Sequence, residues 1–149
     1  MANKTQVTFS ANGVASGTTG TETAITLRKS SGFGATSTAV SFVPTANRTF
    51  VITSMVFSAR GHATATLQAT TFNFRLNTSG AVTTSTTPIL FSVKVATPSV
   101  AGAFEAVQVP MSEGYEIFGD GTLQFGVTAN AVFTTNAPTW DVLIIGYEY

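Results

Sequence analysis

The sequence contains no cysteine, which excludes disulfide bonds, thiolate catalysis and cysteine-ligated metal sites. Charged residues make up only 9% of its 149 residues, against about 25% in an ordinary domain. No apolar run approaches about 20 residues, so the sequence predicts no transmembrane helix. Its first residues lead into polar, glycine-rich sequence without the apolar segment of a secretory signal peptide. We therefore expect one soluble globular protein without a secretion signal.

Hydroxyl side chains are abundant where charged ones are few: the chain has 27 Thr and 13 Ser. A hydrophobic fraction of 44% and twelve Phe exclude an intrinsically disordered chain. The formal net charge is zero, which gives no indication of a nucleic-acid or membrane partner. A domain with few charges and no net charge tends to associate. The composition favours a protein that works in an assembly, with a stable, neutral monomer as the alternative.

The few charges are divided unequally along the chain. Residues 1–94 hold all seven bases and one acid, Glu22, whereas residues 95–149 hold six acids and no base. In a sheet fold the two halves interleave, so opposite charges can pair within one subunit. A basic face of one subunit can equally meet an acidic face of its neighbour, which sets register and encounter rate. The sequence leaves both arrangements open.

Strand patterns dominate the sequence. Residues 70–76 alternate with period two, placing Phe72, Phe74 and Leu76 on one face, and residues 89–95 and 123–128 do the same. Residues 49–59 and 140–145 are more continuously apolar, as strands covered on both faces are. The Asp120-Gly121 pair is the strongest hairpin signal. With no convincing helical pattern, we predict an all-β sandwich or barrel of eight to ten short antiparallel strands.

The N-terminal region has low sequence complexity. Within residues 10–24 every residue except Val14 and Glu22 is Ser, Ala, Asn, Gly or Thr. Such a stretch is typical of a flexible arm or of a long surface loop. Residues 6–10 are a weak strand candidate inside the same region. We predict an N-terminal arm over residues 1–24 and a β-sandwich domain over residues 25–149.

The sequence offers little catalytic or metal-binding chemistry. His62 is the single histidine, and a hydrolytic triad would need a carboxylate and an activated hydroxyl beside it. Ser and Thr are so frequent in this chain that a hydroxyl near His62 would not be evidence of a triad. We interpret His62 as a solvated loop residue. Asp120 with Glu116 supplies too few oxygens for calcium, and zinc needs three or four ligands. We predict no enzyme activity, no metal site and no cofactor.

Aromatic residues are the candidate binding groups, since sugars stack on exposed rings. The candidate interface or ligand aromatics are Tyr115, Trp140, Tyr147 and Tyr149. Trp140 opens the last predicted strand beside Val142 and Ile144, where a core or interface position is the stronger interpretation.

The second half of the chain resembles a known family. The segments that carry the resemblance are residues 50–57, the Thr/Ala-rich residues 63–67, residues 107–117, the Gly-Asp-Gly segment 119–125 and the C-terminal residues 142–149. Together they resemble small jelly-roll structural proteins of tailed bacteriophages, which act as capsid decoration or cement proteins and have relatives in tail and fibre-head modules. The resemblance runs from about Thr49 to Tyr149.

The resemblance implies a jelly-roll β-sandwich that forms a homotrimer on the outer capsid surface. The partner would be the major capsid protein of a phage, and the chain would be made in the host cytoplasm and located in the virion. The alternative is a carbohydrate-binding jelly roll, either a phage receptor-binding head or a lectin. Clustering of Tyr115, Trp140 and Tyr147 in an exposed groove would favour the alternative.

Overall fold

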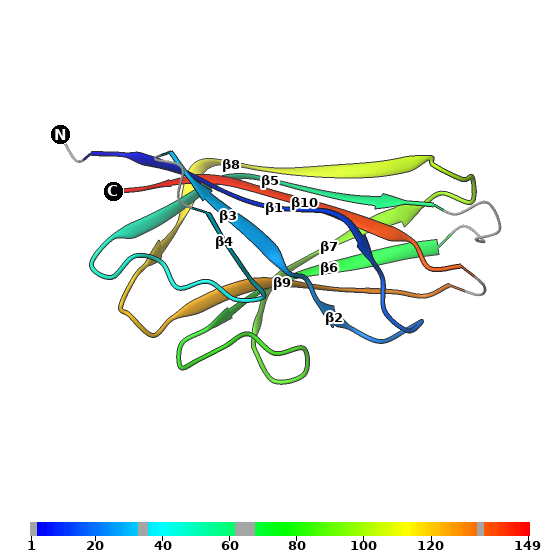
Figure 1. Cartoon of the computed structure of the whole chain (residues 1–149), viewed down its shortest axis with the longest axis horizontal. Coiled ribbons are helices and arrows are strands. Elements are labelled where there is room, and N and C mark those ends of the chain that lie inside the picture. Colours follow the sequence, from blue (N-terminus) through cyan, green and yellow to red (C-terminus); the bar gives the residue numbers. More distant parts are fainter. Residues whose placement is uncertain (1–2, 33–35, 62–67, 134–135) are drawn as a thin grey trace.

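The computed structural model describes residues 3–32, 36–61, 68–133 and 136–149 (Figure 1). These residues form ten strands and no helix. The strands are β1 (Thr5–Ala15), β2 (Thr23–Ala24), β3 (Leu27–Ser31), β4 (Thr36–Ala39), β5 (Thr49–Arg60), β6 (Gln68–Asn77), β7 (Ile89–Thr97), β8 (Phe104–Phe118), β9 (Gln124–Ala131) and β10 (Thr139–Glu148).

Two antiparallel sheets form the two layers visible in Figure 1. The six-stranded sheet has the order β4-β3-β1-β10-β5-β8, and the four-stranded sheet has the order β2-β9-β6-β7. The predicted all-β antiparallel sandwich is confirmed. The jelly-roll type stays a prediction, supported by a chain that crosses repeatedly between the sheets and by the pairing of non-consecutive strands.

The core is aromatic and lies between the sheets. Phe50 stacks on Phe125 with ring centroids 5.4 Å apart, and Phe57 stacks on Phe72 at 5.1 Å. In β10 every second residue is buried, as the period of a strand requires. The outer-face residues Val56, Leu143 and Ile145 are only half-buried, so the expectation that β5 and β10 are covered on both faces is wrong.

The predicted N-terminal arm is also wrong, because β1 is an interior strand. It pairs with β10 from Thr5 to Ala15 on one side and with β3 on the other. Val7 and Phe9 are buried, and the Phe9 ring lies 5.1 Å from that of Phe125. Small and hydroxyl side chains on the solvent face of β1 gave it the composition of a linker. Residues 16–22 connect β1 to β2, so no boundary separates residues 1–24 from the sandwich.

The Asp120-Gly121 turn connects the two sheets instead of closing a hairpin. Asp120 accepts hydrogen bonds from the backbone N–H groups of Leu123 at 2.7 Å and Thr122 at 2.8 Å. These bonds lower the pKa of the Asp120 carboxyl. The turn itself is as predicted, but β8 belongs to the six-stranded sheet and β9 to the four-stranded one. The hairpin prediction is therefore wrong.

Candidate functional site

The four candidate aromatics do not form one site. Trp140 lies fully buried between the sheets, where its Nε1 donates a hydrogen bond to Thr70 Oγ1 at 3.2 Å and its ring meets Phe72 edge-on. Trp140 is therefore a core residue, and its candidacy as a ligand aromatic is wrong. Tyr115, on β8, is half-buried and packs against the core. Neither ring is part of an exposed groove with the others.

Tyr147 and Tyr149 do lie together, at the C-terminal end of the chain. Their ring centroids are 6.1 Å apart, and Lys4 Nζ stands 4.4 Å from the centre of the Tyr147 ring. The Tyr149 hydroxyl donates to Glu116 Oε1 at 3.1 Å. This pair is a small, partly exposed aromatic platform with one carboxylate beside it.

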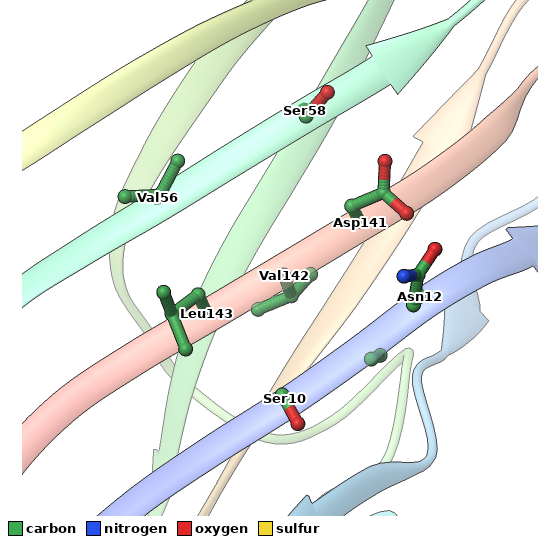
Figure 2. Close-up of a pocket in the computed structure, with 8 residues that line it drawn as sticks. Ser10, Asn12, Val56, Ser58, Asp141, Val142 and Leu143 are labelled. Carbon is green, nitrogen blue, oxygen red and sulfur yellow. The ribbon is translucent and has the colours of Figure 1, made fainter.

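A shallow pocket of about 290 Å³ lies on the outer face of the six-stranded sheet (Figure 2). Ser10 and Asn12 of β1, Val56 of β5 and Leu143 and Asp141 of β10 are among the residues that line it. The Asp141 carboxylate accepts the Gly13 N–H at 2.8 Å and lies 3.5 Å from Arg60 Nη2. Its charge therefore anchors the end of β1 against β10.

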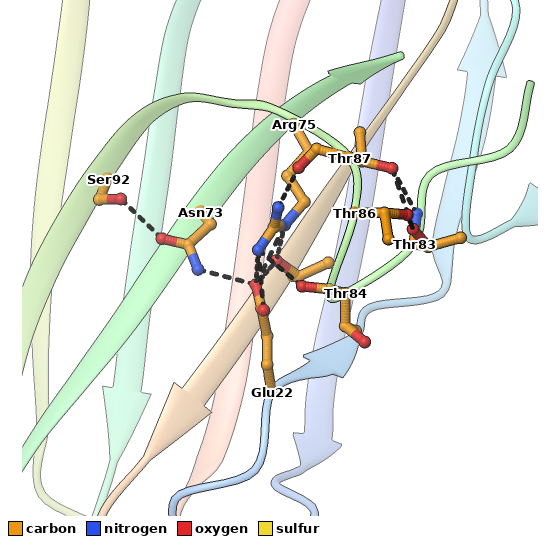
Figure 3. Close-up of polar contacts among 9 residues, drawn as sticks. Glu22, Asn73, Arg75, Thr83, Thr84, Thr86, Thr87 and Ser92 are labelled. Atoms are coloured by element: carbon orange, nitrogen blue, oxygen red, sulfur yellow. Dashed lines mark hydrogen bonds and ion pairs between the residues drawn. The ribbon is translucent and has the colours of Figure 1, made fainter. Parts of the chain in front are cut away.

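A polar cluster stands on the outer face of the four-stranded sheet (Figure 3). The buried guanidinium of Arg75, on β6, binds both carboxylate oxygens of Glu22 at 2.7 and 2.8 Å. Arg75 also donates to the backbone oxygens of Thr84 and Thr87 in the connection between β6 and β7. Asn73 donates to Glu22 at 2.8 Å. The cluster clamps two connections onto the sheet.

The ionisation of Glu22 follows from these contacts. Burial raises the pKa of Glu22, but hydrogen bonds from Thr128, Arg75 and Asn73 and the charge of Arg75 together lower it below its usual value. Glu22 is thus held as a carboxylate whose oxygens are occupied by protein donors. The cluster is structural, and sequence reasoning missed it. The available signal was that Glu22 is the only acid in residues 1–94.

One side of the sandwich carries several exposed apolar side chains among polar ones. β7 and β8 are edge strands of the two sheets; they lie in different layers and approach each other where the segment after β7 leads into β8 (Figure 1). Nine large apolar side chains are exposed among the described residues, and five belong to residues 89–118, here called the β7–β8 side. These five are Ile89, Leu90, Val100, Phe104 and Phe118. Behind them lie half-buried residues of the core margin: Phe91, Val93, Val107, Val109 and Met111.

The ion pairs between described residues show the arrangement in which the two halves of the chain pair inside one subunit; pairing between subunits stays a prediction. Ion pairs Lys29–Glu148 at 3.9 Å and Arg60–Asp141 at 3.5 Å join the basic half to the acidic half inside one subunit. Lys94 and Glu105 are exposed on the β7–β8 side and form no ion pair among the described residues. Part of the charge division is thus internal, and part remains on the surface.

The remaining predictions concern His62, metal ligands, membrane-spanning helices and relatives of the chain. His62 and residues 63–67 lie outside the described residues. Within the described part of the chain, no three His, Cys, Asp or Glu residues gather as metal ligands would. The described residues also include no helix long and apolar enough to span a membrane. Comparison with models of protein families and with curated protein sequences finds no match.

Proposed function

We propose that the protein is a non-enzymatic virion component, a homotrimeric capsid decoration protein that binds the major capsid protein on the outer surface of a phage capsid. The observation that carries the proposal is the exposed apolar β7–β8 side. Its five exposed apolar side chains are spread along β7, β8 and the segment that joins them, and large apolar side chains exposed on one side of a protein favour an interaction site there. The low charge content supports the same conclusion, because it favours association over dispersal.

The outer face at β1, β3 and β4 is suited to the capsid contact. It is rich in hydroxyl and amide side chains, with shallow pockets lined by Gln6, Thr8, Ser30 and Ser31 and by Arg28, Thr36, Ser37 and Thr38. Contacts of this kind depend on shape and hydrogen bonds, so they are weakly sensitive to salt. A trimer multiplies each weak contact, which raises the overall avidity.

The carbohydrate-binding alternative keeps one supporting observation, the Tyr147–Tyr149 pair beside Glu116. Aromatic rings with an adjacent acceptor are what a sugar ring requires. The burial of Trp140 removes the largest ring from such a site. The alternative therefore rests on two tyrosines at the end of β10.

A sedimentation experiment tests the proposal. Capsids of the virus that encodes the chain are stripped of it, mixed with the purified protein and pelleted in about 50 mM and about 500 mM salt, a range over which exposed charges become screened. We expect saturable binding that changes little with salt. Absence of binding would contradict the proposal. Adherence of the free protein to host cells, lost in Tyr147→Ala but kept in Thr8→Ala, would instead support the carbohydrate-binding alternative.

A further inference from the structure

We propose that the pocket on the outer face of the six-stranded sheet receives an uncharged carboxamide side chain, a glutamine or an asparagine of a partner protein (Figure 2). The inference deepens the proposed function and rests on it for the identity of the partner, the major capsid protein. It names the chemistry of one contact between the two proteins.

Strand register arranges the pocket as two neighbouring rows of side chains. One row is apolar at its centre, because Leu143 of β10 lies opposite Val56 of β5. The next row is polar, because Asp141 of β10 lies opposite Ser58 of β5, and Asn12 of β1 lines its other end. An occupant with a short apolar stem and a hydrogen-bonding head would match both rows at once (Figure 2).

The Ser58 hydroxyl indicates that a hydrogen-bonding group is missing from this pocket. Ser58 is only 7% exposed, yet its Oγ has no hydrogen-bond partner in the part of the chain that the structure describes. A buried polar group without a partner costs free energy, so such groups are rare in native proteins. A residue that breaks this rule without a structural gain is expected at a functional site. The hydroxyl therefore points to a group that arrives with a partner.

Two further groups of the polar row have free hydrogen-bonding capacity. The Oδ1 atom of Asp141 accepts the Gly13 N–H at 2.8 Å, whereas Oδ2 accepts no hydrogen bond from the described residues and lies 3.5 Å from Arg60 Nη2. The side-chain amide of Asn12 is exposed and forms no hydrogen bond within the described ranges. The row thus offers acceptors at Asp141 and Ser58 and a donor at Asn12.

These groups select the head of the occupant. A carboxylate would meet the charge of Asp141, and an ammonium group would meet that of Arg60, so a neutral head is favoured. A carboxamide carries two N–H donors and one carbonyl acceptor. Its donors match Asp141 Oδ2 and Ser58 Oγ, and its carbonyl matches the amide of Asn12. A hydroxyl has a single donor and would leave one of the two acceptors without a partner.

The first test is the melting temperature of the free protein. Ser58→Ala removes a buried hydroxyl that has no partner, so it should raise the melting temperature. Ser54→Ala is the matched control, because Ser54 lies on the same face of β5 but accepts a hydrogen bond from Gln108 Nε2 at 3.3 Å. It should not raise the melting temperature. A Ser58→Ala variant that melts at or below the wild-type temperature would overturn the inference.

The second test is the binding of N-acetyl-glutamine methylamide to the full chain, followed through the NMR shifts of backbone amides. We expect weak, saturable shifts confined to residues 10–13, 56–58 and 141–143. N-acetyl-norleucine methylamide, which lacks the carboxamide head, should bind about tenfold more weakly or worse. Asn12→Ala should weaken binding of the glutamine probe without changing the melting temperature.

Equal binding of the two probes would overturn the inference. Shifts of the same amides with methyl glycosides, and none with the glutamine probe, would overturn it in favour of a saccharide site.

Sedimentation with stripped capsids separates this inference from the proposed function. Wild type and Ser54→Ala should bind equally, whereas Ser58→Ala and Asn12→Ala should bind about tenfold more weakly. Full binding by both pocket variants would overturn the inference and leave the proposed function standing. A wild type that ignores capsids, yet binds the glutamine probe in the pocket, would contradict the proposed function and support the carboxamide site.

Discussion

At the scale of single residues, Glu22 with Arg75 and Trp140 with Thr70 stabilise the fold by pairing buried polar groups with one another. Glu22 and Arg75 neutralise each other where two connections cover the four-stranded sheet. The only tryptophan uses its indole N–H to satisfy a buried threonine hydroxyl. Removing one partner of such a pair leaves the other unsatisfied in a poorly solvated place, which costs more than the pair contributes.

The Glu22 carboxylate should make stability depend on acid pH. The pKa of Glu22 is lowered in the folded state. Its contribution to the free energy of unfolding is therefore complete above the unfolded-state pKa of about 4.3, and it is lost as the pH falls through the lower pKa of the folded state. Glu22→Gln should lower the free energy of unfolding by about 3 kcal/mol at pH 7. The difference from wild type should shrink toward pH 2 in urea unfolding. Glu113→Gln, an exposed control, should change little, and an unchanged Glu22→Gln would contradict the clamp.

The Trp140 fluorescence should report a buried indole. Because Trp140 is fully buried, we expect blue-shifted emission and weak quenching by acrylamide in the native protein. Both should reach the values of free tryptophan on unfolding, and added glycans should leave the native spectrum unchanged. Strong native quenching, or a spectral shift with a glycan, would show that Trp140 is accessible after all.

At the scale of elements, β1 shows both what periodicity predicts and where it fails. Val7 and Phe9 alternate correctly, yet the surrounding Ser, Thr, Ala and Gly residues have the composition of a linker. β6 was predictable because its alternation extends over many residues, and β5 and β10 were predictable because their apolar runs are long. The turn at Asp120 was predictable from its Asp-Gly pair. That it joins two different sheets was not, since the sheet to which a strand belongs depends on strands far away in the sequence.

Phe9→Ala tests whether β1 is integral to the sandwich. The Phe9 ring lies within 4.7 to 5.4 Å of three other Phe rings, so its loss should cost about 3–5 kcal/mol of unfolding free energy. Ser10→Ala, the next residue on the outer face, should stay within about 0.5 kcal/mol. Equal, small effects in chemical denaturation would restore the interpretation of residues 1–24 as an arm.

Gly146 marks the close approach of β10 to β5 at a register shift. A Cβ atom on Gly146 would lie 2.2 Å from the Val51 carbonyl oxygen. β10 and β5 can therefore approach this closely only because residue 146 has no side chain. Gly146→Ala should destabilise the protein by about 1–3 kcal/mol. Gly32→Ala is the control, because the nearest atom to its Cβ would be 3.7 Å away. A melting temperature equal for both variants would contradict the strand geometry.

At the scale of the whole molecule, composition favours association, which stays a prediction, and says nothing of which surface would carry it. The low charge content was readable from the sequence, whereas the β7–β8 side exists only because the fold brings two edge strands together. The division of charge was also readable, but only the structure separates the pairs inside one subunit from Lys94 and Glu105 on the surface. The candidacy of Trp140 failed for a related reason, since its exposure depends on which face of β10 meets the other sheet.

The measurement that tests the central claim most directly is the temperature at which particles release their genome. Decorated particles, stripped particles and stripped particles supplied with the purified protein are heated in parallel with a nucleic-acid dye. A protein that bridges neighbouring capsid subunits adds contacts at every junction, so stripped particles should release the genome at a lower temperature and added protein should restore the original value. Identical release temperatures for all three preparations would contradict the account.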